Sequence, residues 1–571
     1  MKEIKKWLAE RIGKLGIKIE AEEIKLERPT DFCFGDWSSN IALILAKKEK
    51  TKPRELAEKI IGGENLPEGV EKVEAAGAGF INFYFKKEIL VEEAEKNNYE
   101  VEFRKKLAKW GHEKGKQKTM VIDYSAPNIA KPFGIGHLRS TNIGQAIYNI
   151  YKILGWNCIG DNHLGDWGTQ FGKMIVAIKH WADDKKIEKL KIEDLERLYV
   201  KFHVEAEKDE KLDEEAREWF LKLEKGDGEA REMWQKIVDL SLTEFGRIYE
   251  MLGVKIDVSH GESFYEPMLG EIIGQIKKAG ISKKSQGAEI VEFAKMPPAM
   301  IEKSNGATTY FTRDLATIAY RIKEWQVDLM VYEVGVDQEL HFRQLFEVAR
   351  LMGWTKKCRL FHVAHGLIRW KDTKFSTRKG QTIHLEEVIE KAIEKAKVAA
   401  KKSRVVKKMK ETERQKTIEA VAVGAIKLAD LMSDPKKDVV FDWERVMSLE
   451  GNSGPYLQYT YARIGSVLKN SEIREQKNME IYDESWEKEE EVLLRYLGRF
   501  EEKIVEAGER FSPAVLVEYL LNLARIYNEF YAKYQIIGEK EEVRRIFLSR
   551  TAGSVLETGL GLLGIEAIEE M

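Results

Sequence analysis

The chain has 571 residues, of which 43% are hydrophobic and 33% are charged. This balance favours packed domains with a charged surface and excludes a largely disordered chain. The 94 basic and 96 acidic residues leave a net charge of −2. A uniformly basic nucleic-acid coat is therefore excluded, whereas a local basic face is not.

Three cysteines, Cys33, Cys158 and Cys358, lie far apart and form no CxxC pair. They argue against a thiolate zinc site and against a secreted disulfide scaffold, so no protein-bound metal is predicted. The N-terminus carries no apolar signal segment, and no run approaches the ~20 apolar residues that span a bilayer. We expect a cytoplasmic protein with no membrane partner.

Residues 1 to about 95 are predicted to form a small α/β domain. Apolar residues recur at helical spacing from Ile4 to Leu15, and the apolar run 79–85 is typical of a strand. A charged helix at about 88–115 is expected to lead out of this domain, and the lysine-rich stretch 114–118 to mark its boundary.

A different pattern begins at Thr119. The short apolar run 120–124 is typical of a buried parallel strand, a loop with two prolines and two glycines follows, and a helix runs from Leu138 to Gly155. Strand, glycine-bearing loop and helix open a doubly wound nucleotide fold. Further parallel strands are predicted at 328–334 and 360–364.

The remaining segments are charged and helical. Residues 173–260 are predicted to be a helical insertion, with one helix ending at Gly253. Beyond residue 385 we expect helices at 486–508 and 512–536, and a basic helix near 401–416. The predicted class is therefore α/β: a Rossmann-type doubly wound parallel-sheet domain (96–385), preceded by the small α/β domain (1–95) and followed by an all-α bundle (386–571).

Two segments carry residues suited to phosphate chemistry. The loop 125–137 enters a helix directly, and a helix N-terminus binds phosphate through its free N–H groups. The segment 374–380 (KFSTRKG) places three cations beside a hydroxyl pair, as a triphosphate requires. Taken alone, the first fits a tight turn equally well, and the second is more typical of a solvated turn.

Together the two segments resemble the HIGH and KMSKS signatures of class I aminoacyl-tRNA synthetases, and the surrounding sequence resembles the arginyl-tRNA synthetases. The matching segments follow the family's order along nearly the whole chain: 35–43 (GDWSSNIAL), 123–133 (DYSAPNIAKPF), 137–141 (HLRST), 162–172 (NHLGDWGTQFG), 310–317 (YFTRDLAT), 335–342 (GVDQELHF), 454–463 (GPYLQYTYAR) and 559–565 (GLGLLGI).

The resemblance implies a reaction and its partners. The carboxylate of L-arginine attacks the α-phosphate of ATP, which enters with Mg²⁺, and the arginyl group then passes to the terminal adenosine of the arginine tRNA. The resemblance makes 386–571 the anticodon-binding domain and 1–95 a domain that touches the tRNA elbow. A monomer is expected.

The resemblance also implies site residues. Arginine would be bound by Asp123, Asn128, Tyr310, Asp314 and Gln338. A guanidinium is permanently charged, so its pocket needs a carboxylate, and Asp314 is the one we expect there. Without the resemblance, Asp314 is better explained as a residue near a helix N-terminus that the dipole stabilises.

ATP would be bound by residues of both signatures and by backbone after the strand at 360–364. These residues are Pro127, Gly134, Gly136, His137, Gly366, Leu367, Lys374 and Ser376, and the catalytic set is His137, Lys131 and Lys374. The histidines His163, His341 and His365 receive no role, and packing is the simpler interpretation of the first two.

Two positions depart from the family pattern. Gly134 stands where HIGH begins with histidine, and Thr377 replaces the second lysine of KMSKS. Losing one phosphate-facing imidazole costs on the order of 2–3 kcal/mol if both act equally, and Lys131 is expected to substitute for the missing lysine. Two alternatives stay open: a catalytically silent tRNA-binding relative, and a class I enzyme for another substrate.

Overall fold

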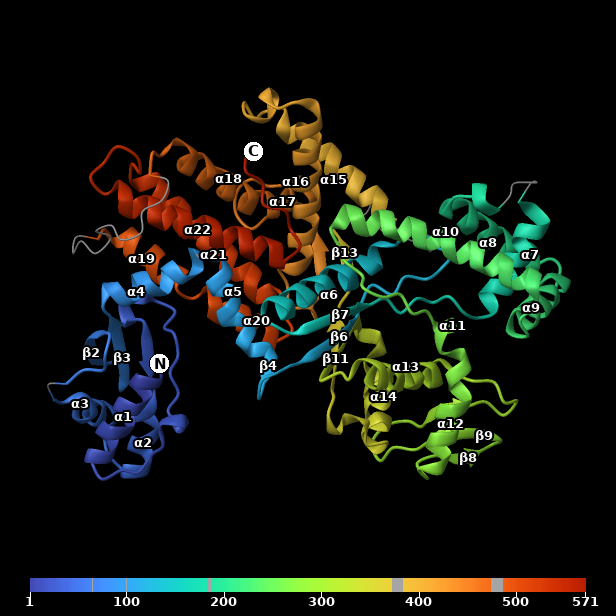
Figure 1. Ribbon diagram of the computed structural model, residues 1–571, viewed down its shortest axis with the longest axis horizontal. Coiled ribbons are helices and arrows are strands. Elements are labelled where there is room, and N and C mark those ends of the chain that lie inside the picture. Colours follow the sequence, from blue (N-terminus) through green and yellow to red (C-terminus); the bar gives the residue numbers. More distant parts are fainter. Residues whose placement is uncertain (64, 99, 183–186, 372–383, 474–485) are drawn as a thin grey trace. The chain divides into compact units, whose positions relative to one another are not determined.

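A computed structural model describes the chain except residues 64, 99, 183–186, 372–383 and 474–485 (Figure 1). The chain forms two compact units. The first comprises 1–103, 463–502 and 522–555, and the second comprises 104–462, 503–521 and 556–571. The three domains inferred from the sequence remain a prediction, because each unit is assembled from separate segments.

The first unit contains a three-stranded antiparallel sheet of order β1-β3-β2. The predicted N-terminal helix is present and buries Ile4, Leu8 and Ile12, whereas Leu15 is exposed. The elements of this segment are α1 (Lys2–Lys14), β1 (Trp37–Ser39), α2 (Ile41–Glu49), α3 (Pro53–Ile61), β2 (Val70–Ala76), β3 (Phe80–Phe85) and α4 (Lys87–Glu95).

Ion pairs, one of them with a fully buried carboxylate, join this N-terminal segment to later helices of the same unit. Arg28 contacts Glu502 at 2.9 Å, and the buried carboxylate of Asp36 pairs with Arg495. The second of these partners lies on α19 (Lys488–Leu497). A pair removed from water in this way is costly to break from one side, because the remaining charge stays buried.

The second unit is built on a four-stranded parallel sheet of order β12-β11-β6-β7. Its strands are β6 (Thr119–Asp123), β7 (Asn157–Asp161), β11 (Leu329–Gly335) and β12 (Arg359–His365). The predicted strands at 120–124, 328–334 and 360–364 are confirmed within a residue. The sequence analysis did not predict β7, whose first residue is exposed and whose last is a buried aspartate.

Helices cover this sheet and carry residues to its edge. The predicted helix after the glycine-bearing loop is α6 (Ile135–Ile153), and Gly155 behind it has the left-handed φ of 85° that ends such a helix. Against the sheet, α13 (Tyr310–Trp325) and α14 (Glu339–Leu351) form a core with β6 and β11 through Val121, Leu315, Met330 and Leu345.

A small subdomain precedes α13. It consists of the short helix α11 (Glu262–Tyr265), α12 (Leu269–Lys278) and an antiparallel sheet of order β10-β9-β8, with β8 (Lys283–Ser285), β9 (Ala288–Val291) and β10 (Ala299–Glu302). The sequence analysis did not predict this sheet.

The predicted helical insertion is confirmed. It comprises α7 (Thr169–Trp181), α8 (Ile192–Ala206), α9 (Lys211–Glu224) and α10 (Gly228–Leu252), and Gly253 ends the last with φ of 59°. Its apolar faces share one core with α15 (Leu385–Ala400) and α16 (Glu411–Leu431), which follow the sheet in the chain.

The rest of the chain is largely helical, with three departures from prediction. The expected helix at 88–115 breaks into α4 and α5 (Glu100–Ala108), followed by the hairpin β4 (His112–Glu113) and β5 (Lys116–Gln117). The expected helix at 486–508 is interrupted at Gly498, between α19 and α20 (Phe500–Glu509). Residues 401–410 are turns and a short 3-10 helix, because Lys401 caps α15 and Lys410 precedes α16.

The remaining elements are β13 (Ile368–Trp370), β14 (Val439–Phe441), α17 (Trp443–Val446), α18 (Gly454–Asn470), α21 (Ala514–Lys533) and α22 (Glu542–Leu562). The predicted helix at 512–536 corresponds to α21. The parallel pair β13–β14 places one short strand inside the segment predicted to be all-α. In the described part of the chain, no helix combines the length and the apolar character needed to cross a bilayer.

Candidate functional site

Most of the predicted site residues with a described position gather at the carboxyl edge of the parallel sheet. The chain enters the sheet at β6, adds β7 on one side, and later adds β11 and β12 on the other. The switch point between β6 and β11 leaves a crevice outside the carboxyl ends of these strands, where open α/β sheets bind ligands. Asp123 ends β6, and Gln338 lies three residues beyond the end of β11.

The loop after β6 is held in a constrained backbone conformation. Three non-glycine residues, Ser125, Ala126 and Ala130, have φ between 45° and 74°, a region that costs on the order of 1 kcal/mol or more for each. Their N–H groups donate to side chains from other elements: Ser140 at 2.9 Å, Asn162 at 3.0 Å and Ser241 at 3.0 Å. These bonds fix the loop.

Within this loop, Pro127 is buried, whereas Asn128 and Lys131 are exposed. The Lys131 ammonium lies 5.5 Å from the ring centre of Tyr199 on α8. The loop therefore presents one amide and one cation to solvent at the mouth of the crevice.

The first turn of α6 has the features expected of a phosphate site. Gly134 caps the helix with extended backbone, and no atom lies within 4 Å of the Cβ position at Gly136. Burial lowers the pKa of His137 to about 4, so the imidazole is neutral at pH 7. Its Nδ1 has no hydrogen-bond partner among the described residues. A neutral imidazole donates one hydrogen bond to a phosphate oxygen but supplies no charge.

The carboxylate predicted to bind a guanidinium lies in the second turn of α13. Asp314 Oδ2 lies 2.6 Å from His341 Nε2, and Oδ1 lies 3.8 Å from His163 Nε2. Tyr310 begins the same helix, and 61% of its surface is exposed. Two of the three histidines without a predicted role, His341 and His163, thus flank Asp314.

Glu262, on α11, is a second acidic residue of this cluster that the sequence analysis missed. Its Oε2 is buried, accepts no hydrogen bond within the described part, and lies 4.0 Å from Arg313 Nη1. Burial, together with the nearby carboxylates of Asp314 and Asp166, raises the pKa of Glu262 to about 8. The only sequence signal was a Gly-Glu-Ser step before the α12 segment, which is weak.

Asp123 is already engaged within the chain. Arg321, fully buried on α13, contacts Asp123 at 2.7 Å and Asp161 at 2.9 Å. Burial raises the pKa of Asp123, against the opposing charge of Arg321. Arg321 therefore already occupies part of the Asp123 carboxylate, and the predicted contact with the substrate ammonium would have to use the rest of it. Gln338 is exposed and donates to Asp337 at 3.0 Å.

The segment after β12 carries the predicted adenine contacts. Gly366 N–H donates to Pro435 at 2.9 Å and Leu367 N–H donates to Asp438 at 2.8 Å. A Cβ at Gly366 would meet Lys437 at 2.8 Å, so only glycine fits there.

His365, just before this segment, lies 3.0 Å from the buried Glu333. Burial alone would lower the pKa of His365, but the Glu333 charge and hydrogen bond raise it.

Lys374 and Ser376 lie outside the described residues, and so does Thr377. The described chain resumes at His384, which bridges to Gly134, and the N–H of Leu385 donates to Phe133 at 2.8 Å. The residues that follow the second signature in the chain, His384 and Leu385, therefore lie against the loop that carries the first.

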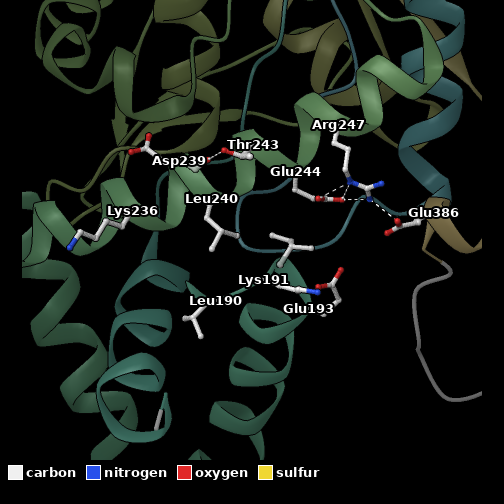
Figure 2. A pocket seen from close by; sticks show the side chains of 11 residues that line it. Leu190, Lys191, Glu193, Lys236, Asp239, Leu240, Thr243, Glu244, Arg247 and Glu386 are labelled. Atoms are coloured by element: carbon white, nitrogen blue, oxygen red, sulfur yellow. Dashed lines mark hydrogen bonds and ion pairs between the residues drawn. The ribbon is translucent and has the colours of Figure 1, made fainter. Parts of the chain in front are cut away.

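A separate cavity of about 650 Å³ lies between α10 and the start of α8 (Figure 2). Figure 2 shows Arg247 pairing with Glu244 of its own helix and with Glu386 at the start of α15. None of the predicted site residues lines this cavity.

Comparison with known proteins agrees with this geometry. Residues 102–443 match the family described as tRNA synthetases class I (R), catalytic domain. Residues 457–571 match the DALR anticodon binding domain, and residues 2–85 match the arginyl tRNA synthetase N terminal domain.

Relatives match over almost their full length. An arginine–tRNA ligase of Halothermothrix orenii is 40% identical over 97% of both chains, and one of Clostridium botulinum is 39% identical over 99% of this chain and 100% of its own. The arginyl-tRNA synthetase structure of Plasmodium falciparum superposes with a TM-score of 0.83 at 25% identity, covering 100% of this chain and 99% of that one. The chain belongs to the arginyl-tRNA synthetase family of class I tRNA synthetases.

Proposed function

We propose that this arginine–tRNA ligase forms arginyl-adenylate at the carboxyl edge of the parallel sheet, with the guanidinium at Asp314 and the triphosphate at the start of α6. The observation that carries the proposal is the Asp314 carboxylate, held at 2.6 Å by His341 and near Glu262, whose buried Oε2 accepts no hydrogen bond within the described part. A buried carboxyl with only one long ion pair in the described chain, here to Arg313 at 4.0 Å, is costly unless a ligand compensates it.

Arginine recognition would use both carboxylates. A guanidinium has five N–H donors in a fixed plane, so it can bind two acceptors from different directions. Asp314 and Glu262 supply these acceptors, and the exposed ring of Tyr310 offers its face or its hydroxyl to the same cation. The α-ammonium would be bound by Asp123 and Asn128, and Gln338 would contact arginine once it releases Asp337.

ATP would bind where α6 begins. The N–H groups of its first turn and the neutral His137 donate to phosphate oxygens, Pro127 and the glycines Gly134 and Gly136 leave room for close approach, and Lys131 supplies positive charge. Lys374 and Ser376 would act from the second signature, and adenine would contact the backbone of Gly366 and Leu367. Since both N–H groups of that pair are engaged, the Gly366 carbonyl is the group we expect adenine to meet.

The reaction follows from this placement. The arginine carboxylate attacks the α-phosphorus, the bond to pyrophosphate breaks, and the cations take up the charge on the leaving group. Mg²⁺ enters with ATP as part of that substrate. The tRNA 2′-hydroxyl then attacks the arginyl carbonyl and AMP leaves.

The tRNA would also contact surfaces outside this site. Residues 401–410, here called the basic turn, carry six exposed cations between α15 and α16: Lys401, Lys402, Arg404, Lys407, Lys408 and Lys410. No ion pair joins them to a described acidic side chain, which leaves their charge to phosphates. Four side chains on α18 are candidates for stacking with unpaired bases: Tyr456, Tyr459, Tyr461 and Arg463. We further propose that the enzyme acts as a cytoplasmic monomer.

The test is arginine-dependent exchange of pyrophosphate into ATP, with and without tRNA, followed by charging of total tRNA with each amino acid. We expect exchange and charging with arginine but not with lysine or citrulline. tRNA binding without exchange under either condition would show a silent relative instead. Asp314→Asn should abolish exchange, with Glu271→Gln, which removes an exposed carboxylate on α12, as the control.

A second variant tests the departure at the first signature. Gly134 has φ of −82° and ψ of 157°, a backbone conformation open to any residue. Gly134→His should therefore form adenylate at least as fast as the parent chain. A large loss would show that the phosphates need the bare backbone at this position.

A further inference from the structure

Two imidazoles meet the carboxylate that recognises arginine in the proposal above. His341 stands in the first turn of α14, and its Nε2 lies 2.6 Å from Oδ2 of Asp314. His163, in the segment after β7, has its Nε2 3.8 Å from Oδ1, beyond hydrogen-bonding distance. One oxygen of Asp314 is therefore held by a histidine, and the other is not.

The imidazole of His341 is fixed in orientation by aromatic neighbours. Phe311 meets its ring edge-on at a centroid distance of 5.6 Å, and Phe342 does so at 5.5 Å. Since a carboxylate only accepts hydrogen bonds, Nε2 is the donor in this contact. The ring thus offers an N–H along a direction set by packing rather than by solvent.

We propose that His341 is a positioning residue for arginine recognition: its Nε2–H holds Oδ2 of Asp314 so that Oδ1 faces the guanidinium. This inference rests on the proposed function. The hydrogen bond orients Asp314 and leaves its charge available to the substrate.

The experiment compares His341→Gln with His341→Leu in the full-length enzyme, by pyrophosphate exchange. Glutamine places an amide N–H near the position of Nε2, whereas leucine has no donor. We expect the leucine variant to raise the arginine KM on the order of tenfold, with the ATP KM unchanged. The glutamine variant should have an arginine KM close to that of the parent at pH 8. If His341 served only to fill space, the two variants would not differ in this way.

Two outcomes would overturn the proposal. One is an equal arginine KM in the leucine and glutamine variants. The other is a leucine variant whose ATP KM rises as much as its arginine KM, because a group that only positions Asp314 leaves ATP binding unchanged.

The proposed function fails differently. If Asp314→Asn kept the parent's arginine KM, the guanidinium would lie elsewhere and the role of His341 would fall with it. If Asp314→Asn abolished binding while both His341 variants behaved as the parent, only the positioning role would be refuted. If the leucine variant fails to fold, His341→Met, which also lacks an N–H donor, replaces it in the comparison with His341→Gln.

Discussion

Glu262 is expected to make the ligand-free enzyme less stable as pH rises. Burial and the adjacent carboxylates raise the pKa of this carboxyl to about 8. The folded chain therefore keeps a proton that the unfolded chain loses near pH 4.5. Because the folded state binds more protons over this interval, stability is full below the lower value and declines as pH rises towards 8.

The size of the effect follows from the side chain's environment, since only 14% of its surface is exposed. Each pKa unit corresponds to about 1.4 kcal/mol, so the full penalty is on the order of 4–5 kcal/mol as an upper limit. Glu262→Gln retains the shape and removes the titration. Its stability advantage over the parent should grow by about 2–3 kcal/mol between pH 6 and pH 8.

Thermal unfolding of the ligand-free enzymes at pH 6, 7 and 8 measures this difference. At roughly 2–4 °C per kcal/mol for units of this size, the gap in melting temperature should widen by several degrees. Saturating arginine should narrow the gap, because the guanidinium compensates the ionised Glu262. A gap that does not change with pH would refute the reasoning, as would an equal effect from Glu271→Gln on the exposed side of α12.

Three further predictions concern other parts of the chain. Burial lowers the pKa of Lys427 to about 7. Between pH 7 and about pH 10.5 the unfolded chain therefore binds more protons than the folded chain, so the free energy of unfolding should rise with pH. Lys427→Met should flatten this rise when urea unfolding is measured at pH 7 and 9, and an unchanged pH dependence would contradict the prediction. Arg139 contacts Asp430 at 2.8 Å, and both side chains are buried. Asp430→Leu leaves the arginine charge buried without its partner, so the free energy of unfolding in urea should fall by about 3–5 kcal/mol. A fall below about 1 kcal/mol would show that the pair contributes little. Glutamate in place of Lys407 and Lys408 in the basic turn should weaken tRNA binding. The slope of the logarithm of the binding constant against the logarithm of salt concentration should become shallower by roughly 0.7–0.9 per lost phosphate contact. The same replacement at the exposed Lys356 and Lys357 should change neither quantity.

The sequence predicted the parts of the fold that follow from local pattern. The strands β6 and β11 are short apolar runs buried on both faces, β12 carries the apolar pair Val363 and Ala364 at its buried end, and α6 and α10 end at glycines with left-handed φ. β7 escaped prediction because its exposed first residue and its terminal aspartate hide the strand pattern. The break at Gly498 escaped because the apolar spacing of α19 and α20 runs on without a proline between them.

The site shows the same limit. The order of the motifs along the chain predicts that the loop before α6 and the start of α13 belong to one site, but it cannot show which side chains touch. His341 is 27 residues from Asp314 and Glu262 is 52, so the packing of α11, α13 and α14 alone brings them together. A pairing of this kind has no sequence period.

The ion pairs that Arg28 and Asp36 form with Glu502 and Arg495 bear on how the chain can be shortened. Removing residues 1–85 would remove two ion-pair partners at once and leave the largely buried Arg495 and the partly exposed Glu502 without their opposite charges. If such a fragment charged tRNA poorly, two causes could not be told apart: loss of tRNA contacts made by residues 1–85, and destabilisation of the remaining helices. The fragment's activity reports on the role of residues 1–85 only if Arg495 and Glu502 are also replaced by neutral side chains of similar volume.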